Sequence, residues 1–252
     1  MNIFNHGKDL LRDIFYSDIR RFETFSYLKS VFTEKWYNLI EPTVPPNNLD
    51  WYTVYSILDR ETRARVGVSY YVPHHLYAAY KPFLQRKGYT LAWDDTYLRK
   101  TLLKTEHLPD GVFRDIDERT LEEYLRISGV CFPDFSNNAE YGGMCVEFAR
   151  RGRPEDDKVM RNIMLFDAGQ PVAFGSVLYS RSLRLAYIHN VGTHPEHRRK
   201  GHFARLIQFL CHEAALDDVS EIYANAKTDG PSYHGFLSCG FQENIRYHLF
   251  TS

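Results

Sequence analysis

Hydrophobic and polar positions in the N-terminal third of the chain follow two different patterns. Between Asn5 and about Lys35, apolar residues recur at mixed three- and four-residue steps, which predicts one or two amphipathic helices. Glu41 to Asp50 is rich in proline and asparagine, and we predict a turn-rich loop there. Trp51–Leu58 and Arg63–Val72 are rich in β-branched and aromatic residues, so we predict a strand in each.

A helix from about His75 to Arg86 is predicted to end at Lys87-Gly88, because glycine readily adopts the left-handed conformation that caps a helix. A strand from Tyr89 to Arg99 follows. The turn signal Pro109-Asp110-Gly111 comes next, and we place a domain boundary just before it. The expected organisation is an N-terminal α/β domain at residues 1–107 and a second domain at residues 108–252.

In the second half, turns and caps separate the apolar stretches more clearly. Ala168-Gly169-Gln170 joins two of the apolar stretches and predicts a hairpin. The predicted elements in order are a strand at 111–116, helices at 117–128 and 138–151, strands at 161–167, 171–180 and 183–193, a helix from 202, a strand at 221–226, a helix at 232–238 and a final strand.

Composition and charge narrow the functional classes. Hydrophobic residues make up 44% and charged residues 25% of the chain, which is typical of a globular protein. The net charge of −1 provides no basic field for nucleic acid, so an anionic ligand would need a local site. We see no signal peptide, no membrane-spanning stretch and no C-x-x-C pair among the four cysteines. We therefore predict a cytoplasmic protein with reduced thiols and neither nucleic acid nor membrane as a partner; its oligomeric state is not written in the sequence.

The most informative stretch begins where the strand at 183–193 ends. It runs from Val191 to Ala204 as a strand end, a proline turn, three cations, a glycine and the start of an amphipathic helix. The first amides of a helix have no internal partner and carry the positive end of its dipole. Gly201 leaves room for a bulky anion beside these amides. We predict a phosphate or diphosphate site here; the alternative is a solvated basic loop.

This stretch resembles the acetyl-CoA signature of the GNAT superfamily of N-acetyltransferases, Arg/Gln-x-x-Gly-x-Gly/Ala after the fourth strand. Arg198 and Gly201 match the signature, whereas Phe203 stands where the family has glycine or alanine. The element order from Gly111 to Ser252 is also similar to a whole GNAT domain, and Gly240-Phe241 resembles the Gly-Phe that closes its fourth helix. The resemblance implies an α/β fold with a mixed sheet flanked by helices.

In that family the fourth strand pairs with the pantetheine arm of acetyl-CoA, and the diphosphate lies on the loop that follows. The resemblance therefore implies acetyl-CoA as co-substrate. The expected cofactor-binding residues are Asn190, Val191, Gly192, Thr193, Arg198, Arg199, Lys200, Gly201, His202, Phe203, Ala204 and Phe236.

Direct acetyl transfer to an amine needs a proton acceptor, an oxyanion donor and a proton for the departing thiolate. Alternate residues of a strand share a face, so we expect 187, 189, 191 and 193 to lie together, with His189 as the base; a structural histidine is the alternative. The resemblance assigns the oxyanion to the Val191 amide. The family's acid tyrosine is Phe236 here, which leaves Tyr233 or water to protonate the thiolate.

Other chemistries fit the sequence less well. Four histidines between His189 and His202 suggest a metal, but Pro195 keeps them off one helix face, and we expect no metal. The favoured function is an N-acetyltransferase acting on a primary amine of a small molecule or peptide. Acidic residues at Asp134, Glu140 and Glu147 could attract that amine. The alternative is a catalytically weak acyl-CoA-binding protein with a regulatory or scaffold role.

One segment of the N-terminal half is similar in sequence to a segment of the second half. Its segment from His75 to Tyr89 is similar to the segment from Tyr233 to Phe241, because both place an aromatic residue after a glycine at a helix end. This similarity has two explanations. The N-terminal half is either a degenerate partial copy of the same fold, which would make the protein a tandem arrangement, or similar by chance. No Arg-x-x-Gly loop precedes the first segment, so the copy has no visible diphosphate site.

Overall fold

The computed structural model describes residues 10–11, 15–35, 37–103, 107–133, 137–151 and 157–252, which form two compact units. The first unit holds most of residues 98–225 together with 231–242. The second holds residues 11–97 together with 226–230 and 243–252. Neither unit is therefore one uninterrupted stretch of chain. The predicted domain boundary between residues 107 and 108 stays a prediction.

The second unit is a mixed sheet with the strand order β1-β2-β3-β4-β11. Its strands are β1 (Tyr16–Arg21), β2 (Phe25–Ser30), β3 (Leu39–Pro42), β4 (Ser69–Pro73) and β11 (Gln242–Thr251), and the first part of β5 (Thr90–Thr101) also belongs to this unit. Pairing is parallel between β3 and β4 and antiparallel between β4 and β11. The last strand of the chain thus completes the sheet of the N-terminal half.

The prediction of helices between residues 5 and 35 was wrong over residues 16–30, where β1 and β2 form an antiparallel hairpin, whereas Leu10 and Leu11 are helical. Phe25 and Tyr27 are both fully buried and alternate along β2, which is the period of a strand. Apolar residues at mixed three- and four-residue steps are compatible with a helix and with a strand. Pairing in the sheet stabilises the strands here. Residues 5–9 and 12–14 of the predicted segment lie outside the described part of the chain.

The strand predicted at Trp51–Leu58 is also wrong, because these residues begin helix α2 (Trp51–Arg63). Asp50 caps the helix, and its carboxylate accepts a hydrogen bond from the Thr53 amide at 3.1 Å. Val54 and Ile57 lie three residues apart and are both buried, as one helix face requires. The cap and this buried face outweigh the strand preference of the aromatic residues. The strand predicted at Arg63–Val72 is reduced to β4.

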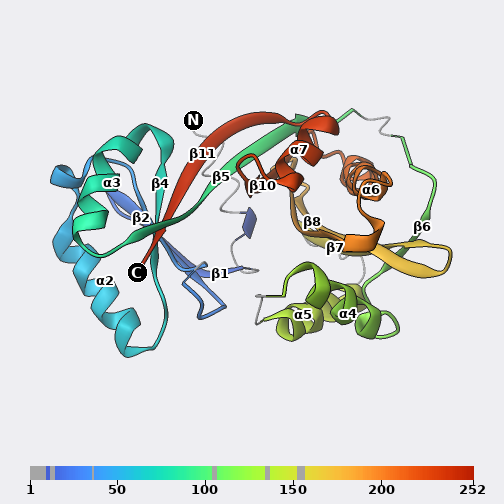
Figure 1. The fold of residues 1–252 in the computed structure, drawn as a ribbon, viewed down its shortest axis with the longest axis horizontal. Coiled ribbons are helices and arrows are strands. Elements are labelled where there is room, and N and C mark those ends of the chain that lie inside the picture. The colour runs from blue at the N-terminus through green and yellow to red at the C-terminus, as the bar shows by residue number, and fades with distance from the viewer. Residues whose placement is uncertain (1–9, 12–14, 36, 104–106, 134–136, 152–156) are drawn as a thin grey trace. The chain divides into compact units, whose positions relative to one another are not determined.

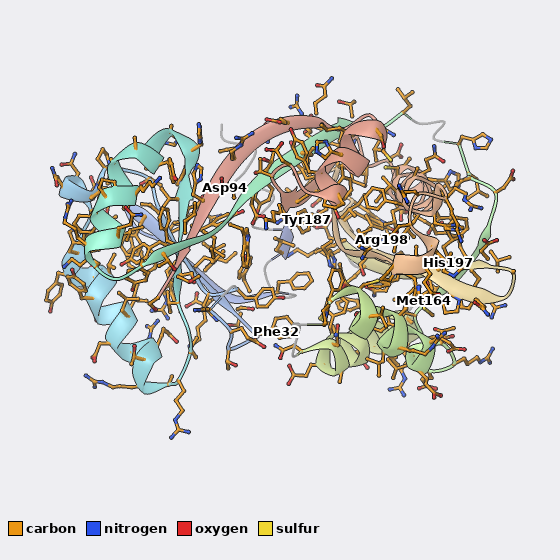
Figure 2. All side chains as sticks on the ribbon, viewed as in Figure 1. Phe32, Asp94, Met164, Tyr187, His197 and Arg198 are labelled. Carbon is orange, nitrogen blue, oxygen red and sulfur yellow. The ribbon has the colours of Figure 1, made fainter. Side chains whose placement is uncertain are left out.

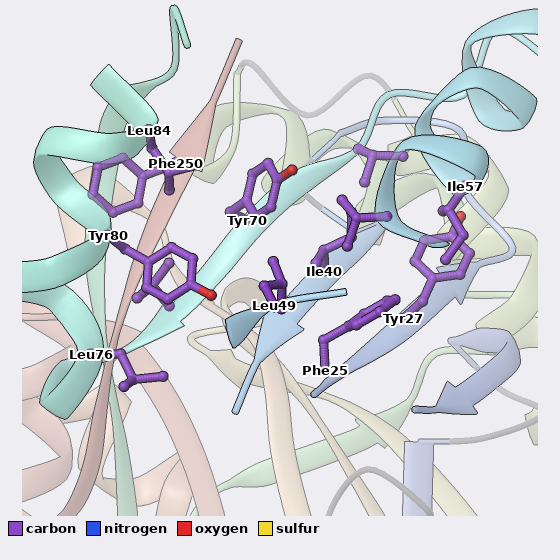
Figure 3. Packing of buried hydrophobic residues seen from close by; sticks show 13 residues of the cluster. Phe25, Tyr27, Ile40, Leu49, Ile57, Tyr70, Leu76, Tyr80, Leu84 and Phe250 are labelled. Carbon is purple, nitrogen blue, oxygen red and sulfur yellow. The ribbon is translucent and has the colours of Figure 1, made fainter. Parts of the chain in front are cut away.

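Helices α2 and α3 (Tyr77–Arg86) pack on one side of the sheet of this unit. Figure 3 shows the core between them, in which side chains from α2, α3 and β11 meet those of β2, β3 and β4. Members from distant parts of the sequence are Phe25, Ile40, Val54, Tyr70, Tyr80 and Phe250, and each is at most 2% exposed.

The first unit carries the strand order β10-β9-β8-β7-β6. Helices α4 and α5 lie below the strands in Figure 1 and α6 and α7 above them. The elements are β6 (Val112–Asp115), α4 (Leu121–Cys131), α5 (Asn138–Arg151), β7 (Lys158–Asp167), β8 (Gln170–Ser180), β9 (Leu185–Thr193), α6 (His202–Leu216), β10 (Glu221–Lys227) and α7 (Pro231–Ser238). The predicted element order and the mixed sheet flanked by helices are confirmed.

Sequence-local signals explain why this half was easier to predict. Ala168 and Gly169 have φ values of 48° and 80°, which is the left-handed two-residue turn that the β7–β8 hairpin needs. The apolar stripe of α6 buries Leu206, Ile207 and Leu210, as its helical spacing requires.

Strand β9 contains a bulge that determines how its side chains are presented. Its register with β8 shifts between the pairs Phe174↔Gly192 and Ser176↔His189, so Asn190 and Val191 lie opposite the single residue Gly175. Asn190 has a φ of 51°, a left-handed conformation that asparagine tolerates better than most residues. The extra residue turns two consecutive side chains toward the same face of the sheet.

The predicted common face of residues 187, 189, 191 and 193 is therefore only partly correct. The rings of Tyr187 and His189 stack at 5.9 Å on one face. Asn190 joins that face, where its amide nitrogen donates to the Tyr124 hydroxyl at 3.1 Å. Val191 lies on the opposite face, because a Cβ built on Gly175 would lie 3.3 Å from Val191 and 3.2 Å from Leu206 of α6.

Both halves of the chain end a helix in the same way before their last strand. Gly88 after α3 and Gly240 after α7 have φ values of 84° and 86°. The amide of the aromatic residue after each glycine donates to the carbonyl five residues back, at 3.0 Å for Tyr89 and 3.1 Å for Phe241. This is the Schellman arrangement. It confirms the predicted glycine cap and strengthens the similarity between the halves.

Replacing Gly192 with alanine tests the packing beside the bulge. A Cβ at this position would lie 2.4 Å from Phe174 Cζ, so we expect Gly192→Ala to lower the free energy of unfolding by about 1–3 kcal/mol through overpacking. Gly143→Ala on α5 is the control, because nothing lies within 4 Å of its added Cβ. Urea denaturation of both variants checks this, and equal midpoints for the two would contradict the packing described.

Candidate functional site

The strand pair β9–β10 opens beside the bulge. The two strands run parallel and pair from Leu185↔Glu221 to Ile188↔Ala224, and the pairing ends there. From His189 to Thr193, the β9 edge on the β10 side therefore has no strand partner in the described part of the chain. An unpaired strand edge presents peptide groups that can bond another amide-containing chain.

His189 is held by a tyrosine from α5. The Tyr141 hydroxyl lies 3.0 Å from both His189 Nδ1 and Ser176 Oγ, and it donates to the serine oxygen. A tyrosine hydroxyl has one proton, so in this arrangement it accepts from Nδ1–H and leaves Nε2 as the basic nitrogen of the ring. The hydrogen bonds around Tyr141 therefore determine the tautomer of His189.

Burial governs the charge of His189. The residue keeps some exposed surface, but its Nε2 atom is shielded from solvent. This desolvation lowers the pKa of His189 to about 3, so the ring is neutral at physiological pH. A neutral ring can accept a proton, but so low a pKa makes it a weak base.

The unpaired edge of β9 leads into an exposed cationic loop. Arg198, Arg199, Lys200 and Gly201 are all exposed. Arg198 Nε donates to the Thr193 carbonyl at 3.3 Å, which ties the loop to the strand end. In Figure 2, Arg198 lies in the same unit as Tyr187. Among the described residues, Arg199 and Lys200 form no ion pair, so their charges are not neutralised by a neighbour.

The backbone of this loop is shaped to expose its amides. Arg199 and Gly201 have φ values of 61° and 81°, and a left-handed backbone of this kind turns successive amides in one direction. The first helical amide with a backbone acceptor is that of Arg205, which bonds the Gly201 carbonyl at 3.1 Å. From Arg199 to Ala204, no amide has an acceptor within the described residues. The loop can therefore donate several hydrogen bonds to one anion.

Phe203, the departure from the signature, packs toward α7. Its ring lies 5.2 Å from that of Phe236, and a Cβ built on Gly235 would lie 2.7 Å from it. Gly235 therefore provides the space that Phe203 needs. Phe236 is only 2% exposed and also contacts Phe241, so its side chain is part of this packing. Tyr233 is on the same helix and is 6% exposed, and its ring lies 5.1 Å from that of His234.

The side chain of His202 is turned inward, so only its backbone amide faces the anion-binding side of the loop. The ring is 2% exposed, and its Nδ1 lies 2.7 Å from Arg205 Nη2. Burial and the Arg205 charge lower the pKa of His202. Of the acidic residues predicted to attract the amine, Glu140 and Glu147 are exposed on α5, and Asp134 lies outside the described residues.

Sequence reasoning missed three residues that anchor the bulge: Tyr124, Tyr141 and Ser176. Ser176 was the easiest of them to single out from the sequence, since it is a polar residue inside a mostly apolar strand. The two tyrosines lie at buried positions of α4 and α5 and look like ordinary core residues. Their hydroxyls bond His189 and Asn190, which lie 48 and 66 residues away along the chain.

Two general expectations can be compared with the structure. The four cysteines form no disulfide. Among the described residues, no helix has both the length and the apolar character to cross a bilayer.

Comparison with known proteins gives a family for the site-bearing part of the chain. Residues 121–241 match the model of the Acetyltransferase (GNAT) family. This span includes α4, β9, the cationic loop, α6 and the Gly240-Phe241 helix end. No curated protein matches the chain.

Solved structures share the fold over nearly the whole chain. A conserved protein of unknown function from Staphylococcus epidermidis matches with a TM-score of 0.67 at 12% identity, covering 96% of both chains. A GCN5-related N-acetyltransferase from Kribbella flavida matches at 0.65 and 15%, covering 98% of this chain and 92% of its own. A tandem GNAT protein from the clavulanic acid biosynthesis pathway matches at 0.54 and 12%, covering 91% and 78%. At these identities the likeness concerns the fold alone.

The bulged strand, the loop of open amides and the family match converge on one segment. That segment, residues 121–241, is similar to the acetyltransferase domains that the GNAT family model describes.

Proposed function

We propose that this domain binds acetyl-CoA and transfers the acetyl group directly to a primary amine of a small molecule or peptide. The observation that carries the proposal is one continuous surface, in which the unpaired edge of β9 leads into the open amides from Arg199 to Ala204. Acyl transfer in general is what the family model supports. Acetyl-CoA, the amine and the direct route are the finer parts of the proposal.

The two parts of this surface suit the two parts of the coenzyme. The pantetheine arm contains two amides and would pair with β9 between His189 and Thr193 as a neighbouring strand does. The diphosphate would accept hydrogen bonds from the loop amides, with Arg199 and Lys200 adding charge. The chain needs no basic field for this, because the positive groups are local.

For the chemistry, we assign proton acceptance to His189 and stabilisation of the thioester oxyanion to the Val191 amide. The attacking nitrogen becomes positively charged as it bonds to the carbonyl carbon, and its proton is then more acidic than in the free amine. A weakly basic ring can take that proton when it is held close. Tyr233 would protonate the departing thiolate, with water as the other source.

The proposal also covers the chemical class of the acceptor and the cellular location. We propose a cationic amine as acceptor, with Glu140 and Glu147 as exposed acidic groups that could attract it. The N-terminal half, which resembles a degenerate copy of the GNAT fold, would support the domain or determine its acceptor specificity. We propose a cytoplasmic location, and no role for nucleic acid or membrane.

A second function is favoured by two specific observations. Phenylalanine replaces the family's acid tyrosine at position 236, and the pKa of His189 is far below neutrality. A domain with both features could retain the coenzyme and lose turnover, acting as an acyl-CoA-binding regulatory or scaffold protein.

Binding of the coenzyme is the first prediction. We expect calorimetry to detect one molecule of coenzyme A or acetyl-CoA per chain, with Arg199→Glu and Lys200→Glu each weakening affinity about tenfold, because a charge that contacts the diphosphate is reversed. Arg126→Glu on α4 is the matched control, since Arg126 is also exposed and carries the same charge. Equal loss in all three variants, or no heat in the wild type, would contradict the proposal.

Turnover separates the two functions. We expect a thiol-release assay with acetyl-CoA and a panel of primary amines to show turnover, and His189→Ala to lower kcat by about 10²- to 10⁴-fold, as loss of a proton acceptor does. Coenzyme affinity should stay within about twofold, because the loop is unchanged. Binding without turnover on any amine would instead support the regulatory function.

Acid sensitivity follows from the buried state of His189. Its folded-state pKa of about 3 lies below the unfolded value, so the unfolded chain binds a proton that the folded chain excludes, and stability falls as pH drops below about 6.5. We expect His189→Asn, which can keep the Tyr141 contact, to reduce this slope by up to about 1.4 kcal/mol per pH unit. Urea midpoints between pH 7 and 5 measure it. The exposed His75→Asn is the control and should keep the wild-type slope.

A further inference from the structure

Three potential metal ligands meet behind the cationic loop. Asp167 at the end of β7, His197 in the turn before the loop and His202 at the start of α6 place one ligand atom each within 4.8 Å of the others. The three residues come from different elements, so no histidine spacing along a single helix predicts this cluster from the sequence. Two imidazoles and one carboxylate are a donor set that suits zinc and similar transition ions.

One imidazole nitrogen of each histidine in this cluster is buried and has no hydrogen-bond partner among the described residues. His202 is 2% exposed, and its Nε2 has no hydrogen-bond partner. Nδ1 of His197, which is labelled in Figure 2, is buried and also lacks one. Buried polar atoms in native proteins nearly always have a partner, so two such nitrogens in one cluster indicate a missing ligand.

The spacing fits an ion better than a direct hydrogen bond. His202 Nε2 lies 3.6 Å from Asp167 Oδ2, which is too long for an N–H···O bond. Two ligands on one tetrahedral zinc, each bonded at about 2.0–2.1 Å, are about 3.3 Å apart. A small inward shift of the three side chains would complete such a site.

We propose that Asp167, His197 and His202 bind one Zn²⁺ or similar first-row divalent ion, with water as the fourth ligand. This departs from the expectation of no metal, which rested on the lack of a shared helix face. The ligands instead converge from a hairpin, a turn and a helix start.

The ion would act on the loop that the two histidines enclose. Arg198 to Gly201 lie between His197 and His202 in the sequence, so coordination fixes both ends of that loop. The left-handed residues Arg199 and Gly201 are then held in the conformation that exposes the amides. Where the proposed coenzyme binding holds, ion and coenzyme should strengthen each other's binding by the same factor.

Arg205 competes with the ion for His202. Its Nη2 donates to His202 Nδ1 at 2.7 Å, which places the ring proton on Nε2. Coordination through Nε2 requires that proton to move to Nδ1 and the Arg205 side chain to turn away. Arg205 is partly exposed and can turn toward solvent. Removing the guanidinium should therefore improve ion binding.

The test uses the full chain, stripped of metal with a chelator and titrated with Co²⁺ and then Zn²⁺ in the absence of coenzyme. We expect one Co²⁺ per chain with the intense visible absorption of four-coordinate cobalt, displaced by Zn²⁺. Asp167→Asn and His197→Ala should each weaken binding at least about tenfold, as loss of one of three protein ligands does. Arg205→Met should strengthen it, and His75→Ala in the other unit should leave it unchanged.

Circular dichroism of each variant verifies folding, and His202 is left intact because its ring is buried. No cobalt absorption in the wild type would overturn the proposal, and so would equal affinity in wild type, Asp167→Asn and His197→Ala. Because the titration contains no coenzyme, its result is independent of the proposed acetyl transfer. Coenzyme calorimetry with and without Zn²⁺ then measures the coupling on its own.

Discussion

The bulge in β9 is the constraint on which the rest of the candidate site depends. It puts His189 and Asn190 on one face, where tyrosine hydroxyls from α5 and α4 hold them, and it sends Val191 to the other face. Just before the bulge, the pairing of β9 with β10 ends. A regular strand would have kept both neighbours and left no peptide edge for a ligand. Asn190 is suited to the position because it tolerates the left-handed backbone.

Prediction from sequence succeeded where the signals were local. The β7–β8 turn, the glycine after each closing helix and the apolar stripe of α6 are determined by neighbouring residues. It failed at Trp51–Leu58, where strand-preferring side chains form a helix, because the Asp50 cap and burial of one face outweigh propensity. It also failed at β1 and β2, whose apolar spacing fits either period until a sheet partner is known.

In the candidate site, too, the locally determined features could be predicted from the sequence and the others could not. The open amides between Arg199 and Ala204 could be predicted, since any helix start has them and the glycine and cations beside it are visible in the sequence. The bulge could not, because it exists only relative to Gly175 on β8. The anchoring tyrosines were hidden for a related reason, as their partners are remote in the sequence. Features that arise from pairing or packing at long range leave no local trace.

The start of α6 shows how one short segment can serve two purposes. Backbone amides there have no acceptor among the described residues, whereas the His202 side chain is buried against Arg205 and near Asp167. Main chain and side chain of the same residue therefore face different chemistry. A substitution at His202 would change the inner cluster without deleting an amide, and a charge change at Arg199 would alter the outer loop without touching the cluster. The two surfaces can be separated by mutation, even though they share a helix end.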